Sequence, residues 1–512
     1  MSASQDKKKR QADREAGIDR RTMAERQADE KRRKERTKWT IGTVIVVILV
    51  AAILMANSPV VSRGLNSVTI GGEKYNNVEY QYYYNAAYSN YYMFIDGNKA
   101  ASAQQCMLDP TMTWAEFFRQ NALDTMTQTT ALYEAAIAEG YALTEEDSAT
   151  IDESFASMKE DAAANNLSMK SYLVRRFGRG CTEKQLRGIL EKELIVSRFA
   201  QDYVDSLEYT PEQLNAWYAE NKDAQDLFDY TYYLVAAETE EVTETVTDPE
   251  TQETTEQTVQ KVTDKTMAAA KATADQLAEA ATDAEAFAAA VEALGEDAAV
   301  KETAGGQSNG FDAAYSEWML DAARQPGDVT VAESEGEGYY VVLFQNRDDN
   351  SYRTQNSRHI LIRAVDEDGD GVISDSEKEA AKAAVEAIYE EWKAGEATED
   401  SFAALANEKS EDGGSNTTGG LYENVQKGSF VPEYNDFIYA EGRKPGDTAI
   451  VYGESGNYTG YHLVYYVGEG ERYCDVLAKN TLSNEDYQAW ITSLTEGYSA
   501  STNFVIRFAD ER

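Results

Sequence analysis

The sequence predicts an α+β protein in which one transmembrane helix and a helix-rich N-terminal module precede two α+β units of similar order. Three observations indicate this organisation. Residues 41–56 form a nearly continuous apolar run, residues 67–225 carry apolar side chains at helical spacing, and residues 226–470 repeat one order of strand, helices, turn and strand. At 512 residues the chain is long enough for several domains.

The N-terminal region divides into a basic tail and an uncharged segment. Residues 1–38 hold 14 Lys/Arg and 8 Asp/Glu, and residues 39–62 carry no charge. We expect residues 1–38 to form a basic cytoplasmic tail and residues 39–62 a transmembrane anchor, because the positive-inside rule places basic flanks in the cytoplasm. The expected location is the cell membrane, with a single pass and the bulk of the chain extracytoplasmic. A cleaved signal peptide is the alternative, although its charged region is normally shorter.

The remaining chain is strongly acidic. Residues 39–512 hold 34 Lys/Arg and 82 Asp/Glu, a net charge of −48. Such a body repels phosphate backbones, so we expect no nucleic-acid partner. The three cysteines, Cys106, Cys181 and Cys474, have neither metal-ligand nor redox spacing, and we interpret them as buried small hydrophobic residues. One disulfide with a leftover thiol is the other possibility, since the sequence does not pair them.

Residues 67–225 read as a helical, chaperone-like domain. A short hairpin is expected over 68–75, and Thr113 with Glu116 and Thr210 with Gln213 have capping-box spacing. Seven tyrosines crowd residues 80–92, which suits a core seam or an adaptable groove for unfolded chains. The C-terminal region 471–512 is expected to form a helix and a strand that pack back on this module.

The two repeated units cover residues 226–350 and 351–470. The first opens with a strand-like segment at 228–235, has an Ala-rich helix from about residue 267, and closes with Arg-Gln-Pro-Gly-Asp at 324–328 and a strand at 338–344. The second opens at 358–362, has a helix over about 377–394, and closes with Arg-Lys-Pro-Gly-Asp at 443–447 and a strand at 460–464. Each unit is therefore expected to be an antiparallel sheet covered by helices. The Thr/Glu-rich insert at 237–264 reads as a mobile or extended hairpin loop.

Both histidines of the chain, His359 and His462, fall on the first and last strands of the second unit. Around them stand Phe-Ala-Ala-Leu-Ala at 402–406, Ser-Glu-Asp at 410–412, Gly-Gly-Leu at 419–421, Lys-Gly-Ser-Phe-Val-Pro-Glu-Tyr at 427–434 and Gly-Tyr-His at 460–462. With these motifs residues 357–468 resemble the parvulin family of peptidyl-prolyl isomerases. The resemblance implies cis-trans isomerisation of X-Pro bonds, which needs no cofactor for catalysis.

The resemblance also implies roles for individual residues. The paired core histidines correspond to His359 and His462, and Asp412 falls at the acidic-or-cysteine position beside them. Thr459 is expected to supply a neighbouring hydroxyl. The expected substrate-binding residues are Phe430, Tyr434 and Leu421, with Phe430 standing where a methionine is common.

In the first unit Tyr232 and Tyr340 stand where the second has His359 and His462, so residues 226–350 read as a degenerate, non-catalytic copy. A helical module followed by one degenerate and one intact parvulin-like unit resembles the SurA/PrsA-type extracytoplasmic chaperones. The implied function is a membrane-anchored isomerase and chaperone acting on unfolded or newly secreted polypeptides. The alternatives are a non-catalytic chaperone that uses both units as peptide clamps, and a surface scaffold.

A second motif lies inside the intact unit. Residues 366–377, Asp-Glu-Asp-Gly-Asp-Gly-Val-Ile-Ser-Asp-Ser-Glu, match the calcium-loop pattern at every specified position. Hard cations such as Ca²⁺ take six to eight oxygen ligands, and such a loop supplies them from alternate positions. The expected ligands are Asp366, Asp368, Asp370, the Val372 carbonyl, Ser374 and Glu377. We expect a structural Ca²⁺ that orders the loop and starts the following helix; an acidic solvated loop is the alternative.

Overall fold

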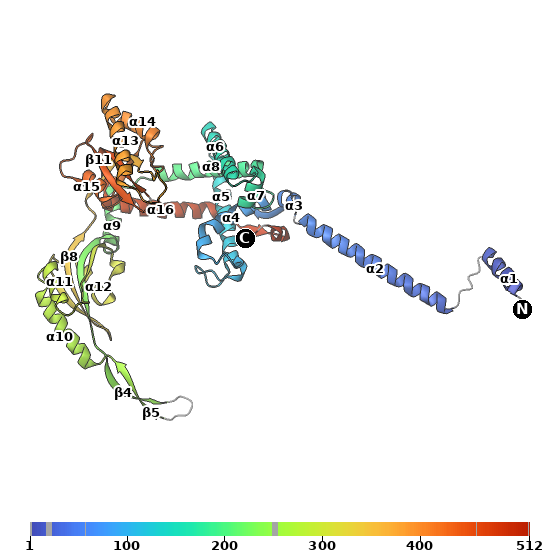
Figure 1. Ribbon diagram of the computed structural model, residues 1–512, viewed down its shortest axis with the longest axis horizontal. Coiled ribbons are helices and arrows are strands. Elements are labelled where there is room, and N and C mark those ends of the chain that lie inside the picture. Colours follow the sequence, from blue (N-terminus) through green and yellow to red (C-terminus); the bar gives the residue numbers. More distant parts are fainter. Residues whose placement is uncertain are drawn as a thin grey trace. The chain divides into compact units, whose positions relative to one another are not determined.

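The computed structural model describes residues 3–16, 23–56, 58–247, 254–456, 458–509 and 511 (Figure 1). The chain divides into two compact units. Unit 1 comprises residues 1–207 and 485–512, and unit 2 comprises residues 208–484. The two ends of the chain therefore contribute to one unit.

Two helices come first, α1 (Ala3–Glu15) and α2 (Met23–Ala56). Large apolar side chains of α2 between Trp39 and Val50 are half or more exposed. Residue 57 of the expected anchor, together with the side chains of 51–56, lies outside the described part of the chain. Among the described residues no helix meets the length and apolarity that a membrane crossing needs.

The rest of unit 1 is a group of helices beside a small antiparallel sheet. Strands β1 (Asn66–Ile70) and β2 (Glu73–Asn76) form the expected hairpin, and β13 (Ala500–Thr502) pairs with β1 in the order β13-β1-β2. The helices are α3 (Pro59–Gly64), α4 (Asn77–Tyr91), α5 (Trp114–Ala138), α6 (Glu145–Ala164), α7 (Met169–Phe177) and α8 (Glu183–Asp205), with short 3₁₀ turns η1 (Tyr92–Phe94), η2 (Ala101–Ala103) and η4 (Phe504–Phe508).

Helix ends in unit 1 follow from side-chain capping. Thr113 accepts from the Glu116 amide while the Glu116 side chain accepts from the Thr113 amide, which is the capping box read from the sequence. The tail contains the expected helix and strand, α16 (Tyr473–Thr495) and β13, and residues 504–508 after them form a 3₁₀ turn. Asn503 begins this turn, because its side chain accepts a hydrogen bond from the Val505 amide.

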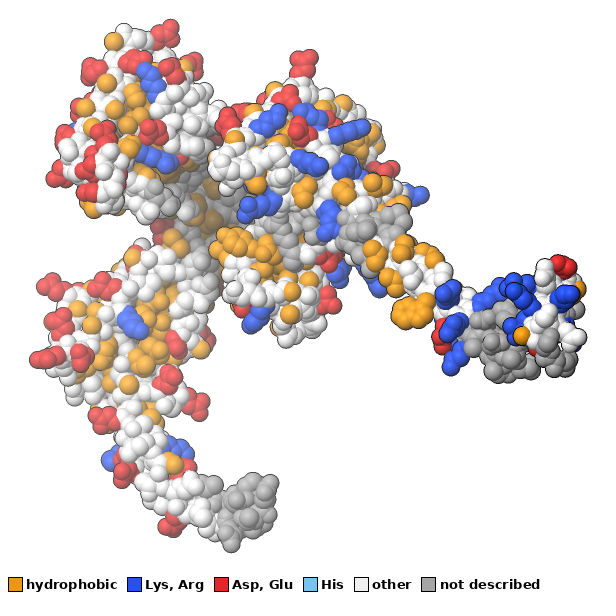
Figure 2. Space-filling model, turned by 45° about the vertical axis from the view of Figure 1, so that its right-hand side comes forward, with side chains coloured by type: hydrophobic (Ala, Val, Ile, Leu, Met, Phe, Trp, Pro, Cys, Tyr) orange, Lys and Arg blue, Asp and Glu red, His pale blue; other side chains and the backbone are white. Residues whose placement is uncertain are grey.

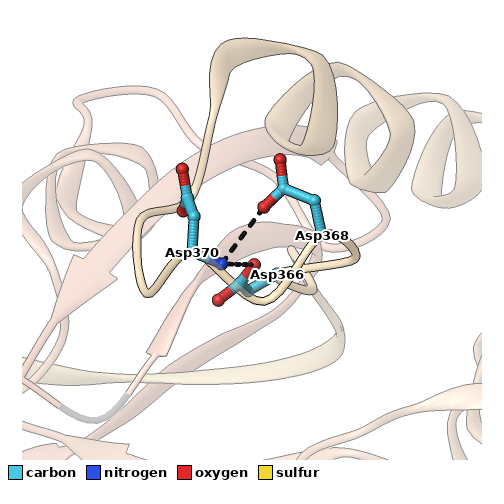
Figure 3. A group of neighbouring side chains, drawn as sticks. All are labelled: Asp366, Asp368 and Asp370. Carbon is cyan, nitrogen blue, oxygen red and sulfur yellow. Dashed lines mark hydrogen bonds between the residues drawn. The ribbon is translucent and has the colours of Figure 1, made fainter.

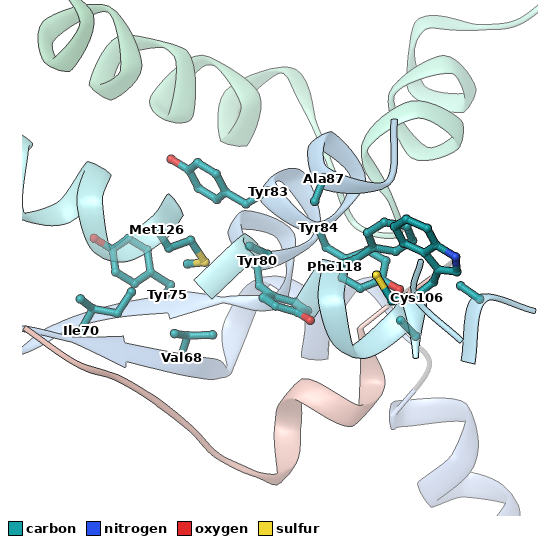
Figure 4. Close-up of a cluster of buried hydrophobic side chains, with 14 residues drawn as sticks. Val68, Ile70, Tyr75, Tyr80, Tyr83, Tyr84, Ala87, Cys106, Phe118 and Met126 are labelled. Atoms are coloured by element: carbon teal, nitrogen blue, oxygen red, sulfur yellow. The ribbon is translucent and has the colours of Figure 1, made fainter. Parts of the chain in front are cut away.

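The core of unit 1 is built from tyrosines of α4 (Figure 4). Tyr80 and Tyr84 are fully buried among Val68, Ile70 and Phe118. Of the two alternatives, Tyr80, Tyr83 and Tyr84 form the core seam, whereas Tyr92 is 60% exposed. The core also receives the far end of the chain, since the Asn77 side chain donates to the Val505 carbonyl at 2.9 Å and Tyr80 donates to Glu511 at 2.7 Å.

Unit 2 begins with α9 (Pro211–Gln225), which the sequence assigned to the helical module. Hydrogen bonds tie α9 to the following sheet instead: Tyr218 donates to Asp226 at 2.8 Å, and Arg347 pairs with Asp223 at 2.6 Å. The domain boundary therefore precedes α9 rather than following it. At the other end, α16 (Tyr473–Thr495) starts in unit 2 and ends in unit 1.

Two four-stranded antiparallel sheets of unit 2 have the same strand order. The first is β6-β3-β8-β7 and the second is β10-β9-β12-β11, so each places its first and last strands side by side at the centre. The first sheet contains β3 (Leu227–Ala236), β6 (Lys301–Gly306), β7 (Val329–Ser334) and β8 (Gly338–Asp348), with α10 (Asp264–Ala280), α11 (Ala284–Glu292), η3 (Ser308–Gly310) and α12 (Ala313–Leu320). The insert in this unit forms a separate ribbon of β4 (Glu240–Thr247) and β5 (Thr254–Lys261).

The second sheet carries the histidines. It contains β9 (Arg353–Arg363), β10 (Leu421–Val425), β11 (Thr448–Ser455) and β12 (Tyr458–Arg472). On one face α13 (Asp375–Ala394) and α14 (Glu399–Lys409) pack over Ile360 and Leu463. On the other face α15 (Pro432–Tyr439) packs over Val464 and Tyr466. The two faces therefore differ in their cover, and the histidines lie on the α15 side.

Candidate active site

The register of the two central strands brings the histidines together. His462 lies opposite Leu361 and His359 lies opposite Val464, so the two histidines are diagonal neighbours on one face of the sheet. Both are 2% exposed. Their rings are nearly parallel, with centroids 5.0 Å apart. The pairing expected from the resemblance is therefore present in the structure.

A chain of hydrogen bonds runs through both imidazoles. The Nδ1 atoms of His359 and His462 are 2.9 Å apart, Nε2 of His359 is 2.8 Å from Oδ2 of Asp412, and Nε2 of His462 is 2.8 Å from the Tyr458 hydroxyl. An ionised carboxylate only accepts, so His359 Nε2 carries the proton of that bond. Between the two Nδ1 atoms, and between His462 Nε2 and the Tyr458 hydroxyl, the tautomer of each ring decides which group donates.

Asp412 receives three side-chain donors on one oxygen. Besides His359, the Ser415 hydroxyl donates at 2.6 Å and the Tyr422 hydroxyl at 3.0 Å. The hydrogen bond from His359, helped by Ser415, holds the pKa of the Asp412 carboxyl well below its usual range. The negative charge is thereby fixed at one end of the chain.

Burial has the opposite consequence for the histidine at the other end. It lowers the pKa of His462 to about 3, because the charged ring would lose its water, and neighbouring His359 adds to the shift. Burial also raises the pKa of the Tyr458 and Tyr422 phenols. His462 is therefore neutral at physiological pH, and the network is suited to positioning and electrostatics rather than to proton transfer.

Aromatic rings form a wall over the imidazoles. Phe430 stacks on Tyr434 with centroids 4.4 Å apart, and Tyr422 meets Phe430 edge-on at 5.1 Å. Tyr434 is fully buried, and its hydroxyl lies 2.9 Å from that of Ser357. Of the two residues predicted to grip a proline ring, Phe430 is thus the more accessible one, while Tyr434 forms the floor beneath it.

Two predicted site residues lie on the other face of the sheet. Side chains alternate along a strand, so Thr459 points away from the face that carries Tyr458 and His462. Leu421 pairs with Arg358 on the α14 side, whereas Tyr422 pairs with Ser357 on the histidine side. The hydroxyl beside His462 belongs to Tyr458 and the side chain after the double glycine that reaches Asp412 is Tyr422.

Sequence reasoning missed Tyr422, Tyr458 and Ser415. Period-two alternation, counted outward from His462 and from the double glycine, would have found the two tyrosines. The spacing of Ser415 from Asp412 is typical of a local turn contact, and it had no distinguishing signal in the sequence.

The double-glycine turn fixes the start of β10 against His359. The His359 amide donates to the Gly420 carbonyl at 2.9 Å, and Gly420 has a φ of +69°. A Cβ atom on Gly420 would lie 2.2 Å from the His359 carbonyl oxygen. Glycine is required here because the two backbones meet so closely.

The predicted calcium loop lies between β9 and α13 (Figure 3). Ligand atoms of Asp366, Asp368 and Asp370 lie within 4.8 Å of one another. Glu377 is not in this group, since its carboxylate accepts from the amides of Glu367 and Ser374 at 2.7 Å each. Ser374 caps α13 and Val372 is 64% exposed. The structure thus gathers three of the predicted ligands.

The corresponding place in the first sheet has no imidazole. Tyr232 and Tyr340 lie there, with ring centroids 6.0 Å apart, and the Tyr340 hydroxyl donates to Asp312 at 3.2 Å. Tyr315 is buried against both rings. The three cysteines are free and buried, as the sequence suggested.

Comparison with known proteins gives one family match. Residues 339–467 match the model of the PPIC-type PPIase domain, a parvulin family. None of the curated proteins matches the chain.

Several solved structures show partial similarity. Peptidylprolyl isomerase PrsA of Bacillus anthracis is 19% identical, with 29% of this chain and 59% of that chain covered and a TM-score of 0.18. PrsA of Bacillus cereus is 22% identical over 32% and 53%, also with a TM-score of 0.18. A SurA-like chaperone of Campylobacter jejuni is 14% identical over 43% and 78%, with a TM-score of 0.17.

The matched regions span little more than half the length of the two PrsA structures. The family model and the site agree on the same residues, because 339–467 includes both histidines, Asp412 and the aromatic wall. The chain therefore contains a parvulin domain of the PPIC type.

Proposed function

We propose that the chain is a membrane-anchored, extracytoplasmic peptidyl-prolyl cis-trans isomerase and chaperone. The isomerase proposal rests on the chain of hydrogen bonds from Tyr458 through the buried His462 and His359 to Asp412, which lies beside the aromatic wall of Phe430 and Tyr422. The substrates would be unfolded or newly secreted polypeptides with X-Pro bonds.

Isomerisation needs no nucleophile, because the barrier of roughly 18–20 kcal/mol comes from amide resonance. A site lowers it by binding the twisted amide better than either planar isomer. The Phe430 ring offers an apolar surface for the proline ring. The fixed charge of Asp412 and the oriented imidazoles supply a preorganised field beneath it. His359 and His462 act in this scheme as positioning residues.

A protease-coupled assay on a proline-containing peptide tests the proposal with the full chain. We expect activity above the uncatalysed rate and at least about a tenfold loss of kcat/KM in Asp412→Asn, equivalent to about 1.4 kcal/mol of transition-state stabilisation. Tyr340→Phe is the matched control, because it removes the hydrogen bond to Asp312 in the first sheet and should leave the rate unchanged. A wild-type rate equal to background would refute the isomerase.

A chaperone role is supported by an exposed apolar group on unit 1. Tyr92, Met93, Phe94, Met107 and Leu108 are each 50–71% exposed. Methionine and aromatic side chains adapt to varied partners, and exposed apolar patches mark interaction sites. Met93→Ser with Met107→Ser should weaken suppression of client aggregation without changing the isomerase rate. Equal suppression by both proteins would count against this surface.

A binding-only clamp is the second candidate. The first sheet favours it, because an aromatic cluster around Tyr232, Tyr315 and Tyr340 replaces the imidazoles while the strand order is kept. The two candidates separate in His462→Gln. If the chain is only a clamp, the wild type has no measurable isomerase rate and the variant suppresses aggregation as fully as the wild type. If the chain is an isomerase, the variant loses the rate that the wild type shows.

The anchor is supported by α2, whose large apolar side chains from Trp39 to Val50 are exposed after a basic segment. Extraction of cell membranes at alkaline pH should leave the chain in the pellet. Intact-mass measurement of the purified protein distinguishes an uncleaved anchor from a cleaved signal peptide, because cleavage removes the basic tail.

The loop at 366–377 is proposed to hold a structural Ca²⁺. The three clustered carboxylates are the hard oxygen donors that Ca²⁺ prefers. Glu377 would join them by releasing its hydrogen bonds to the amides of Glu367 and Ser374. The ion would order the loop and needs no part in the isomerisation.

A further inference from the structure

Four arginines gather around one loop of unit 1. Arg175 and Arg176 lie in the last turn of α7, Arg179 lies in the loop that follows, and Arg63 lies in the last turn of α3. We call these four residues the arginine cluster. Residues 169–187 hold six Lys/Arg and one Asp/Glu, a net charge of +5 in a chain whose net charge is −42.

Close contacts join the loop that carries Arg179 to α3 and α4. A Cβ atom on Gly180 would lie 3.1 Å from the Ser62 Cβ and 3.7 Å from the Arg63 Cγ, so the loop and α3 touch. The Gln81 side chain of α4 donates to the Arg179 carbonyl at 3.3 Å. The loop is therefore anchored on two helices, and its basic side chains are carried on a packed base.

The cluster borders an open groove of about 490 Å³, lined by Asn165, Leu167, Tyr172, Arg175 and Arg176. Arg176 donates to the Tyr172 hydroxyl at 3.2 Å. The planar guanidinium group of arginine is positively charged and can donate two parallel hydrogen bonds to the oxygens of a phosphate group. Lys and Arg side chains are also frequent on the face of unit 1 seen in Figure 2, whereas Asp and Glu dominate the visible faces of unit 2.

The position of the arginine cluster in the sequence indicates what kind of partner it binds. Helix α3 begins at Pro59, three residues after α2 ends at Ala56. On α3 and just after it, Val60 is 78% and Leu65 is 46% exposed, so apolar side chains flank Arg63. A surface that combines basic and apolar side chains directly after a membrane anchor suits the headgroup region of a bilayer.

We propose that the arginine cluster binds the phosphate groups of anionic phospholipids and holds unit 1 against the membrane surface. This inference rests on the proposed anchor, which brings α3 to the bilayer. The groove beside Tyr172 accommodates a headgroup, and the acidic remainder of the chain is repelled by the same surface. The membrane-facing side of the chaperone module is thereby fixed.

Hydrogen exchange of the full chain in vesicles tests the proposal. The vesicles are phosphatidylcholine alone, or phosphatidylcholine mixed with phosphatidylglycerol. Peptides covering 169–187 should exchange at least about fivefold more slowly in the anionic vesicles, which corresponds to about 1 kcal/mol of added local stability. High salt should remove the difference, because it screens exposed charges. Equal exchange in both vesicles overturns the proposal.

Variants separate the cluster from general charge effects. Arg63→Glu with Arg175→Glu, Arg176→Glu and Arg179→Glu should lose the protection, whereas Lys at the same four positions should keep most of it. The matched control reverses four exposed or half-exposed lysines of unit 2, Lys265, Lys271, Lys301 and Lys378, and should keep the protection. If the Glu variant does not fold, Gln at the four positions replaces it.

Flotation distinguishes failure of the cluster from failure of the anchor. A chain that floats with both vesicles but shows no lipid-dependent protection retains the anchor and overturns the cluster. A chain that floats only with anionic vesicles, and only at low salt, supports the cluster and refutes the anchor. Equal protection by a polyglutamate peptide without lipid also overturns the proposal, since it makes the partner an acidic polypeptide.

Discussion

Protonation of His462 can be followed directly, because the chain has two histidines and a histidine-labelled sample therefore gives two imidazole signals. The perturbation is a change of pH from about 8 to about 4.5, the range that an ordinary imidazole with a pKa of about 6.5 crosses. Burial lowers the pKa of His462 to about 3. At pH 5 His462 should thus be about 1% protonated, compared with about 97% for a free imidazole.

The difference between the folded and unfolded pKa of His462 also makes the free energy of unfolding depend on pH. The folded-state pKa of His462 lies below the unfolded value, so at pH 5 the unfolded chain binds a proton that the folded chain does not. The contribution of His462 to the free energy of unfolding is complete above about pH 6.5 and is lost as the pH falls toward about 3. Between pH 8 and pH 5 the loss is about 2 kcal/mol, worked from the distance between pH 5 and the unfolded pKa.

The assay is a ¹⁵N titration of tag-free protein labelled on histidine, with His462→Gln to assign the signals. We expect the His462 ring to keep its neutral-form shifts down to pH 4.5. A midpoint near 6.5 for this ring would refute the reasoning, because it would mean that the ring is solvated or that the stacked arrangement with His359 does not form.

Three further predictions concern Tyr458, the calcium loop and the double-glycine turn. Tyr458→Phe leaves the His462 Nε2 without its 2.8 Å partner and should lower kcat/KM about fivefold, the equivalent of about 1 kcal/mol for one hydrogen bond, whereas Thr459→Val on the other face should have no effect. Titration calorimetry should detect one Ca²⁺ per chain with a Kd of about 10⁻⁴ M, typical of extracellular sites, and the heat should disappear when Asp368 and Asp370 are both changed to Asn; absence of heat in the wild type would exclude the site. Gly420→Ala should unfold or misplace the double-glycine turn and abolish activity, because its Cβ would meet the His359 carbonyl. The control is Gly428→Ala, also at positive φ but with open space around it, which should lower the free energy of unfolding by only about 1 kcal/mol in a thermal unfolding experiment. Equal effects of the two substitutions would contradict the close backbone contact.

The repeat placed the two histidines on the first and last strands of the second unit, and Asp412 was placed beside them by the family resemblance. Neither the repeat nor the resemblance could decide which face of the strand each neighbour occupies, and a shift of one residue exchanges the faces. Thr459 and Leu421 were therefore predicted where Tyr458 and Tyr422 lie. The family resemblance predicted a hydroxyl near His462 and assigned it to Thr459. The strand register shows that it belongs to Tyr458.

Boundaries followed a similar pattern. The capping box at Thr210 correctly began α9, but it carried no information on the tertiary partner of that helix. The partner is set by polar contacts more than a hundred residues apart in the sequence, such as the pairs that Arg347 makes with Asp223 and Asp226. Local sequence patterns do not report such distant contacts, so the helix was grouped with the preceding module.

The pairing of β13 with β1 has a consequence for biogenesis. Val68 pairs with Thr502, so the small sheet of unit 1 joins segments that are synthesised more than four hundred residues apart. The sheet that carries the histidines is contiguous from residue 353 to residue 472 and can form while the tail is still emerging. During synthesis, the parvulin domain should therefore fold before unit 1 is complete, and a chain cut short after residue 484 should leave β1 with an unpaired edge that favours aggregation.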